Sequence, residues 1–296
     1  GRPVDYNEMA GYTAFRQANA NRREVLYVAA NDGMLHCFNI DDGVELWSYI
    51  PRNQLSKLQD LMSPTYCHEY FLNMTPGVYD INMSGTWKTV LIGGQAQGGS
   101  GLFALDVTGP AADSVALLWD VNIPALKGAW SAPVLVRDRT LNRQVLVIGT
   151  GYDASVAQAN LLVIDPLNGA VLNTIPIGSP VAGNKITKGV SFDADFDDYE
   201  DKLYFGDLTG KLWRVDLTQN PWVVTPIFDA AQPIQAPPIL TVDEMNRPMV
   251  FFGTGQFLIA SDPTRTDQQT IYGIIDNGSN TLLHVNDLVN QTYAFN

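Results

Sequence analysis

The sequence predicts an all-β protein, and within that class a β-propeller, from three observations. A strand–turn–strand pattern recurs roughly every 50 to 70 residues, as in proteins built from repeated units. Each copy opens with a run of β-branched and aromatic residues, and its turns carry Gly, Asn and Asp. Further short strands lie between the copies and bring each unit to about four strands, the number in a propeller blade.

Five copies follow one another along the chain. The first, residues 24–51, consists of a strand, an Asn-Asp-Gly turn, a second strand, an Asp-Gly turn and a third strand. The other copies occupy residues 88–107, 143–177, 201–217 and 247–276, and intervening strands are expected at 75–81, 130–136, 187–195 and 235–241. In every copy a strand ends on Asn or Asp, namely Asn39, Asp106, Asp165, Asp216 and Asp276.

Stacking of these units explains how the sheets bury their surfaces. A four-stranded sheet cannot cover both of its own faces, so blades pack against one another around an axis. Trp47, Trp119 and Trp213 occur late in their units, where a large ring can fill the gap between blades. A β-sandwich is the competing architecture, but a repeat of this length that occurs five times favours the propeller. A closed ring needs either atypical blades from residues 1–20 and 280–296 or chain beyond this sequence.

Two segments interrupt the strands with helical patterns. In residues 53–62 three leucines and a methionine fall on one side at helical spacing, and Pro64 prevents the helix from continuing. Residues 11–19 are expected to form another turn or two of helix. Both segments are interpreted as short helices packed on the propeller.

The composition excludes several classes of function. Hydrophobic residues make up 46% of the 296 residues, enough for a sizeable core, and the formal net charge is −13. This acidity disfavours nucleic acid and anionic membrane surfaces as partners, because both carry negative charge. No apolar run approaches the roughly 18 residues of a membrane span. We expect a soluble, extracytoplasmic protein that handles cations, and we interpret residues 1–296 as a single propeller domain from a larger protein.

The cysteines and histidines do not form a recognisable site. Cys37 and Cys67 match no zinc or redox spacing. We interpret both as buried hydrophobic side chains, with a disulfide as the alternative in an oxidising compartment. His36, His68 and His284 show no metal-ligand spacing and are expected to be structural. The motifs GxSxG and GxxxxGK are absent, so the sequence contains no sign of catalysis.

The most informative stretch is DADFDDYED, residues 193–201. Two carboxylates about 4 Å apart repel by roughly 4 kcal/mol at an effective dielectric constant near 20, so the stretch is either an open solvated hairpin or a cation site. Carboxylates occupy positions one, three, five and nine of this stretch, and the backbone carbonyl of the tyrosine at position seven can coordinate. This is the ligand spacing of an EF-hand-type calcium loop, and oxygen donors without His or Cys favour calcium over zinc. The predicted ligands of one Ca²⁺ ion are Asp193, Asp195, Asp197, Tyr199 and Asp201.

The loop departs from the EF-hand pattern at two positions. Position six is Asp198 instead of glycine, and it must adopt a left-handed backbone conformation. Position twelve is Tyr204, so the bidentate glutamate is missing, and a strand follows the loop instead of a helix. The remaining acidic side chains, those of Asp198 and Glu200, are expected to point outward.

Several motifs in combination resemble a known family. They are NDGMLHCF (31–38), SPTYCHEYFLNMTP (63–76), VLIGGQAQGGSGLFALDVT (90–108), YFGDLTGKLWRVDL (204–217), QPIQAPP (232–238), VFFGTGQFL (250–258) and YGIID (272–276). In this order, from about residue 11 to residue 290, they are similar to the C-terminal propeller of PilY/PilC-type proteins. The resemblance implies a modified seven-bladed ring and a surface-exposed factor of type IV pili. Such factors act in pilus assembly, in adhesion at the pilus tip and in twitching motility.

The resemblance also implies a role for the acidic loop. In that family, calcium occupancy of the blade loop tips the balance between pilus extension and retraction, a role that falls here on the five predicted ligands. The implied partners are pilus components such as minor pilins and the host-cell surface, with no nucleic acid and no membrane insertion. The implied location is extracytoplasmic, at the cell surface, the pilus tip or the outer membrane of a Gram-negative bacterium.

Two other functions compete with this interpretation. Residues 31–47 also resemble repeats of quinoprotein dehydrogenases, which bind pyrroloquinoline quinone and calcium, but those enzymes typically carry adjacent cysteines and many tryptophan repeats. A generic outer-membrane assembly scaffold would not need the acidic loop. We therefore expect a non-enzymatic, calcium-binding pilus propeller.

Overall fold

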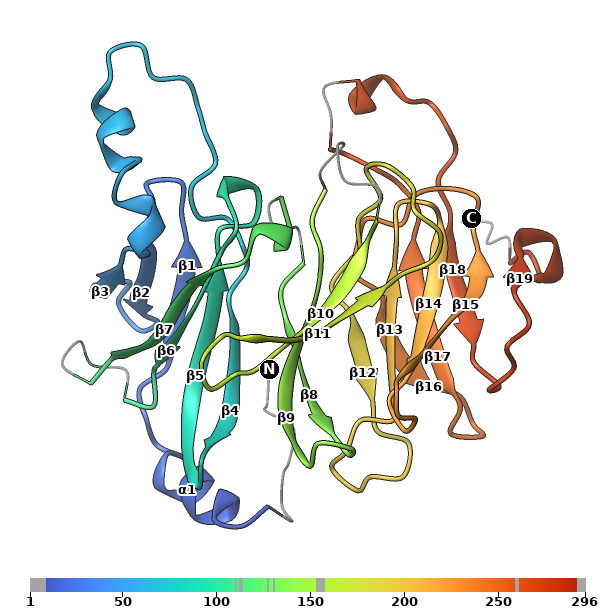
Figure 1. Ribbon diagram of the computed structural model, residues 1–296, viewed down its shortest axis with the longest axis horizontal. Coiled ribbons are helices and arrows are strands. Elements are labelled where there is room, and N and C mark those ends of the chain that lie inside the picture. Colours follow the sequence, from blue (N-terminus) through green and yellow to red (C-terminus); the bar gives the residue numbers. More distant parts are fainter. Residues whose placement is uncertain are drawn as a thin grey trace.

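The structure is a computed structural model that describes residues 9–109, 111, 114–126, 128–129, 131–152, 158–258 and 261–291. Its regular structure is dominated by β-strands, which confirms the all-β prediction (Figure 1). In the part of the chain that the structure describes, the strands form five sheets; the first three follow one another from left to right in Figure 1, and the fourth and fifth overlap at the right. Residues at the two ends of the predicted domain, 1–8 and 292–296, lie outside the described residues.

Each of the five sequence repeats becomes part of one sheet. The first sheet contains β1 (Val25–Ala29), β2 (Leu35–Asn39) and β3 (Glu45–Tyr49). The second contains β4 (Gly77–Met83), β5 (Thr86–Gly94), β6 (Gly101–Asp106) and β7 (Ala116–Asn122). The third contains β8 (Val134–Asp138), β9 (Arg143–Gly149), β10 (Asn160–Ile164) and β11 (Val171–Pro176).

The last two sheets continue the same plan. The fourth contains β12 (Val190–Phe192), β13 (Lys202–Gly206), β14 (Lys211–Asp216) and β15 (Val223–Asp229), and β19 (Leu283–His284) adds to β15 in parallel. The fifth contains β16 (Ile239–Val242), β17 (Pro248–Gly253) and β18 (Ile271–Ile275). The predicted intervening strands therefore correspond to β4, β8, β12 and β16, each of which lies at one edge of its sheet. Trp130, the first residue of the strand predicted at 130–136, lies outside the described residues.

Tight turns join the strands of the first sheet, as the turn residues predicted, whereas longer connections join β9 to β10 and β17 to β18. Neighbours in sequence pair as antiparallel strands, for example β1 with β2 and β2 with β3. Gly33 and Gly43 occupy the two turns of the first sheet with φ values of 91° and 70°, which residues with a side chain rarely adopt. Local hairpin formation thus follows directly from the sequence.

The hydrophobic core consists of layers between consecutive sheets. Four clusters of buried residues join Leu35 (β2) to Phe103 (β6), Trp119 (β7) to Leu146 (β9), Val145 (β9) to Phe205 (β13), and Phe228 (β15) to Tyr272 (β18). Burial of one such side chain stabilises the fold by about 1.5–3 kcal/mol. Each sheet therefore covers a face of its neighbour, which is the stacking expected of blades.

The tryptophans contribute to these layers as predicted, although not equally. Trp119 and Trp213 are only 7% and 6% exposed, and the Trp119 indole donates a hydrogen bond of 2.8 Å to the carbonyl of Pro166, in the turn between β10 and β11 of the next sheet. Trp47 is half-buried, and its ring centroid lies 5.7 Å from that of Tyr27 in the same sheet. Of the three tryptophans, Trp119 therefore directly joins two neighbouring sheets.

The two helical predictions had different outcomes. Helix α1 (Tyr12–Ala18) is present, and its Tyr12 ring packs against Trp87 of β5 with centroids 4.6 Å apart. The predicted helix at 53–62 is wrong, because the segment forms two 3₁₀ turns, η1 (Arg52–Gln54) and η2 (Leu58–Met62). Leu55 and Met62 are 58% and 80% exposed, so the apolar side chains of this segment do not form one buried face.

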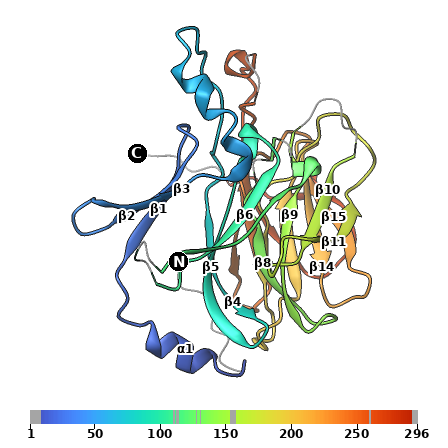
Figure 2. The same ribbon diagram turned by 60° about the vertical axis from the view of Figure 1, so that its left-hand side comes forward.

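The segment that follows stands away from the sheets in both views (Figures 1 and 2). Gln54 of η1 anchors the later part of this segment, since its buried side-chain amide donates a hydrogen bond of 3.2 Å to the carbonyl of Phe71. Cys67 lies in this segment and is exposed, so the prediction that it is buried is wrong. Cys37 on β2 is buried as predicted, and both thiols are free, so the alternative of a disulfide is not realised.

The remaining helical turns are short. They are the 3₁₀ turns η3 (Ala96–Gly98), η4 (Pro124–Leu126), η5 (Asp262–Thr264) and η6 (Val285–Asp287). No helix in the described part of the chain has the length and apolar character needed to cross a bilayer.

Candidate metal centre

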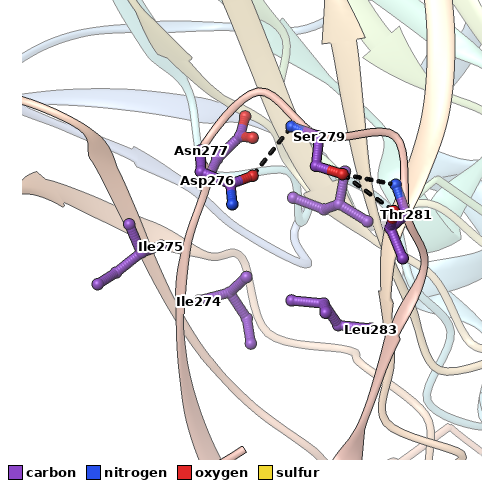
Figure 3. A pocket seen from close by; sticks show the side chains of 8 residues that line it. Ile274, Ile275, Asp276, Asn277, Ser279, Thr281 and Leu283 are labelled. Atoms are coloured by element: carbon purple, nitrogen blue, oxygen red, sulfur yellow. Dashed lines mark hydrogen bonds between the residues drawn. The ribbon is translucent and has the colours of Figure 1, made fainter. Parts of the chain in front are cut away.

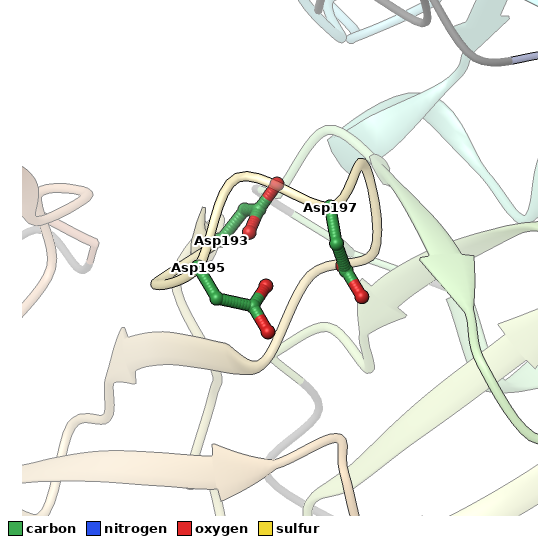
Figure 4. A group of neighbouring side chains, drawn as sticks. All are labelled: Asp193, Asp195 and Asp197. Carbon is green, nitrogen blue, oxygen red and sulfur yellow. The ribbon is translucent and has the colours of Figure 1, made fainter.

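The acidic stretch forms the loop between β12 and β13 (Figure 4). Its base is closed by two hydrogen bonds of Asp201: its backbone N–H donates to the carbonyl of Phe192 at 2.8 Å, and its carboxylate accepts from the amide of Ala194 at 2.8 Å. Asp201 is 9% exposed. The end of the stretch is therefore fastened to its beginning, and the residues between are forced into a tight turn.

Three of the predicted ligands converge inside this turn. One carboxylate oxygen from each of Asp193, Asp195 and Asp197 lies within 4.8 Å of the others (Figure 4). The Asp195 side chain is exposed, whereas the other two are half-buried. Among the described residues no histidine or cysteine joins this group. An arrangement of hard carboxylate oxygens without nitrogen or sulfur donors suits calcium or magnesium.

Backbone amides orient two of these carboxylates. Asp193 accepts hydrogen bonds from the amides of Phe196 at 2.7 Å and Asp198 at 3.0 Å. Asp197 accepts from the amide of Tyr199 at 3.0 Å. The backbone of the loop thus fixes the orientation of these two carboxylates.

The left-handed conformation predicted for position six is present. Asp198 has a φ of 68°, and Phe196 has a φ of 60°. Such values are uncommon for residues other than glycine, although Asp tolerates them better than bulky residues do. The side chain of Phe196 is 77% exposed, so the unfavourable backbone conformation is not compensated by burial. Two residues in this region of φ make the turn tight enough for the carboxylates to meet.

The carboxylates differ in how the protein affects their protonation. Burial raises the pKa of Asp193, although the amides of Phe196 and Asp198 act in the opposite direction. For Asp197, desolvation acts to raise the pKa, but the amide of Tyr199 and the guanidinium of Arg139 outweigh it and lower the pKa. A divalent cation in the turn would stabilise the ionised form of both groups.

Asp201 lies outside the group of three carboxylates, and its Oδ2 atom accepts the hydrogen bond at the base of the loop. The side chain of Tyr199 contacts the neighbouring sheet. The Tyr199 ring lies 3.8 Å from the guanidinium carbon of Arg137 and 5.0 Å from that of Arg139. Its hydroxyl accepts from Arg137 at 2.9 Å and donates to the side chain of Asn142 at 2.5 Å.

Glu200 is buried, and the prediction that it points outward is wrong. Its side chain is 6% exposed, and one carboxylate oxygen accepts a hydrogen bond of 2.6 Å from the backbone N–H of Arg137. That N–H is available because β8 is an edge strand that pairs only with β9. Burial raises the pKa of Glu200 to about 7. Glu200 therefore attaches the loop to the neighbouring sheet.

The loop thus docks on the hairpin of β8 and β9 through Asp197, Tyr199 and Glu200. Sequence reasoning missed the two arginines of this contact, Arg137 and Arg139, because it considered the acidic stretch alone. The available signal was the sequence RDR at residues 137–139, at the end of a predicted strand in a chain with few basic residues.

A second polar group lies at the end of β18, beside a pocket of about 240 Å³ (Figure 3). The lining residues are Ile227, Ile274, Ile275, Asp276, Asn277, Ser279, Thr281 and Leu283. The carboxylate of Asp276 is only 2% exposed and is bonded to Arg214 at 2.7 Å and to the Tyr204 hydroxyl at 2.7 Å. These contacts occupy the carboxylate, so it fastens the structure and is not available as a general base.

Comparison with known proteins identifies relatives of this chain. Residues 3–224 match the family profile described as the PilY1 beta-propeller domain. A type IV pilus biogenesis factor PilY1 homolog from Xylella fastidiosa is 34% identical over 288 residues, which cover 93% of this chain and 23% of that protein. The type IV pilus biogenesis factor PilY1 from Pseudomonas aeruginosa is 34% identical over 305 residues, which cover 90% of this chain and 26% of that protein.

A solved structure has the same fold. The crystal structure of the Pseudomonas aeruginosa PilY1 C-terminal domain matches with a TM-score of 0.74 and 31% sequence identity, and the match covers 91% of this chain and 60% of that one. The chain spans about a quarter of the length of the curated relatives that it matches. These matches confirm the prediction of a β-propeller.

Proposed function

Since the chain belongs to the PilY1 beta-propeller family, we propose that it is the propeller of a type IV pilus biogenesis and adhesion factor. The observation that carries this proposal is the agreement of sequence and fold over nine-tenths of the chain, given by 34% identity to one relative and a TM-score of 0.74 to another. In this proposal residues 1–296 act as one non-enzymatic domain. The relatives are named as biogenesis factors.

The proposed partners and location follow from that role. The propeller contacts pilus components such as minor pilins and, in adhesion, the surface of a host cell. It acts outside the cytoplasm, at the cell surface, the pilus tip or the outer membrane of a Gram-negative bacterium. The net charge of −13 agrees with this assignment, because it disfavours nucleic acid as a partner.

The β12–β13 loop is the proposed regulatory site and binds one calcium ion. The supporting observation is the convergence of Asp193, Asp195 and Asp197 within 4.8 Å in a turn that holds Asp198 in a left-handed conformation. The backbone carbonyl of Tyr199 and the carboxylate of Asp201 complete the proposed ligand set. A flexible turn with many oxygen ligands favours calcium over magnesium, which demands a stricter octahedral geometry.

Calcium occupancy is proposed to regulate pilus extension, retraction and twitching. Binding would order the turn and hold β12 and β13 at a fixed separation. A ligand shifts an equilibrium only as far as its affinities for the two states differ, so the surface around this loop must differ between the calcium-bound and calcium-free forms. A pilus partner that contacts this surface would then respond to calcium.

Calorimetric titration of chelator-treated protein with calcium tests the site. We expect one saturable site in the wild type and a loss of affinity of about tenfold or more for Asp195→Asn, since loop affinity depends on the number of ligand charges. Asp198→Asn is the matched control: it removes the same charge from the same turn, and Asn tolerates the left-handed backbone conformation. Its expected loss is about threefold or less.

Absence of calcium binding by the wild type would contradict the proposed site. If the wild type gives no heat and no rise in melting temperature at about 10 mM calcium, the acidic stretch is a solvated hairpin, since extracellular calcium modules bind at about 0.1–1 mM. The family assignment would stand in that case, but calcium regulation would not. In the full-length protein, twitching that is unchanged by Asp195→Asn would contradict the regulatory role.

A further inference from the structure

Arg139 places a positive charge at the carboxylates proposed to bind calcium. One terminal nitrogen of its guanidinium lies 2.5 Å from the Oδ2 atom of Asp197 and 3.9 Å from the Oδ1 atom of Asp201. The Asp197 side chain is 34% exposed and that of Asp201 12% exposed. The arginine therefore reaches into the loop from a different sheet, and it does so at two of the proposed ligands.

The turn that carries Arg139 is built to hold it there. Asp138, the last residue of β8, is 4% exposed, and its carboxylate accepts hydrogen bonds from the amides of Thr140 at 2.7 Å and Leu141 at 3.1 Å. Asn142 completes the turn with a φ of 46°. Because these bonds fix the backbone on both sides of Arg139, its side chain starts from a fixed point beside the loop.

Contacts other than that of Arg139 hold the loop on this hairpin. The buried carboxylate of Glu200 bonds to the backbone of Arg137, and the ring and hydroxyl of Tyr199 contact the guanidinium group of Arg137. The loop can therefore remain docked while the Arg139 side chain, which is 43% exposed, changes its rotamer. Movement of one side chain would suffice to change the charge at the carboxylates.

We propose that Arg139 is the internal counter-cation of the loop and sets its calcium affinity. The guanidinium neutralises Asp197 when calcium is absent and must move away or be repelled when calcium binds. Calcium loading and the contact of Arg139 with the loop then oppose each other, and by linkage each weakens the other to the same extent. This inference rests on the proposed calcium site and names the residue that couples it to the neighbouring sheet.

The physical basis is the repulsion between a monovalent and a divalent cation that share one carboxylate. Both cations interact with the same oxygen atoms over a few ångströms, where solvent and salt weaken the repulsion but do not remove it. A charged group of this kind therefore lowers the affinity of the loop. It also prevents the crowded carboxylates from destabilising the fold when calcium is absent.

Calcium titrations of Arg139 variants test the inference. We expect Arg139→Gln to bind calcium about five- to tenfold more tightly than the wild type, and the difference to shrink at 0.5 M KCl, where the Debye length falls below about 5 Å. Arg139→Lys keeps the charge and is expected to stay close to the wild type. Arg265→Gln is the matched control, because it makes the same change of net charge at an exposed arginine that pairs with Asp267 instead of with the loop.

Each outcome decides between the proposals. Equal affinities of the wild type and Arg139→Gln would overturn the role of Arg139 while leaving the calcium site intact. Weaker binding by Arg139→Gln would also overturn it, since the arginine would then be a group that orients the ligands. Absence of binding in the wild type and in every variant would overturn the calcium site itself and the inference with it. Equal tightening by Arg265→Gln would show that net charge alone is responsible.

Discussion

At the scale of single residues, two sets of acidic side chains in the described part of the chain contrast with each other. Asp276 is buried and fully paired, with Arg214, Lys202 and the Tyr204 hydroxyl around it. The carboxylates of Asp193 and Asp195 instead face other carboxylates. Desolvation acts to raise the pKa of Asp276, but the Tyr204 hydroxyl, the amide of Gly278 and the two cations outweigh it and lower the pKa below its ordinary value of 3.8.

This lowered pKa predicts how the stability contributed by Asp276 depends on pH. A carboxyl group whose pKa is lower in the folded state contributes stability that is present above the ordinary pKa and lost as the pH falls through the folded-state pKa. We expect Asp276→Asn to be about 1–3 kcal/mol less stable than the wild type at pH 7. That difference should narrow below about pH 4. Urea denaturation at pH 7, 5, 4 and 3 measures it, and a constant difference across this range would contradict the assignment.

At the scale of elements, one arginine fastens the chain after β18 to the fourth sheet. Arg214 on β14 bonds to Asp276 at the end of β18, to the carbonyl of Ser279 at 3.3 Å and to the side chain of Asn280 at 2.5 Å. These contacts bring the chain to the position where β19 pairs with β15 in parallel. The arrangement depends on a contact between residues more than sixty positions apart, so no local pattern predicts it.

Removal of this arginine should therefore destabilise the protein strongly. We expect Arg214→Ala to lower the free energy of unfolding by about 3 kcal/mol, since it leaves a buried carboxylate with fewer partners. The control is Arg265→Ala, whose exposed ion pair with Asp267 is expected to contribute about 0–1 kcal/mol. Chemical denaturation of the two variants compares them. Equal losses of unfolding free energy in the two variants would show that burial of the Arg214 ion pair adds no stability beyond that of an exposed pair.

At the scale of the whole molecule, the sheets are stabilised by their neighbours. In the described part of the chain, the second, third and fourth sheets pack against a sheet on each face, whereas the first and fifth share a hydrophobic cluster with one sheet each. Large apolar side chains are accordingly exposed on the outer two sheets, such as Leu26 at 54%, Ile239 at 69% and Ile271 at 81%. Stability should therefore be greatest in the middle of the stack.

Hydrogen exchange of this 296-residue chain tests that gradient. We expect the amides of the inner strands β9 and β13 to exchange at least about tenfold more slowly than those of β2 and β17, because local opening costs less where fewer apolar contacts must be broken. All four strands are paired on both sides, which makes them a matched set. Equal protection in all four would show that the sheets unfold as a single cooperative unit.

The sequence predicted part of the geometry of the acidic loop but not its surroundings. The spacing of DADFDDYED correctly placed three carboxylates together and the left-handed residue at Asp198. The burial of Glu200 could not be predicted, because it depends on a free N–H group of Arg137, some sixty residues away in another sheet. The arginine contact to Asp197 was missed for the same reason.

The sequence by itself determined most of the strands, though not β7, β15 or β19, and the acidic character of the β12–β13 loop, because hydrophobic alternation, turn residues and the spacing of carboxylates act over a few neighbouring positions. It did not determine the 3₁₀ turns at 52–62, the exposure of Cys67 or the partners of Glu200 and Asp276. Those features depend on which sheets lie side by side. Only the tertiary structure decides them, since burial and charge pairing arise between residues that are distant along the chain.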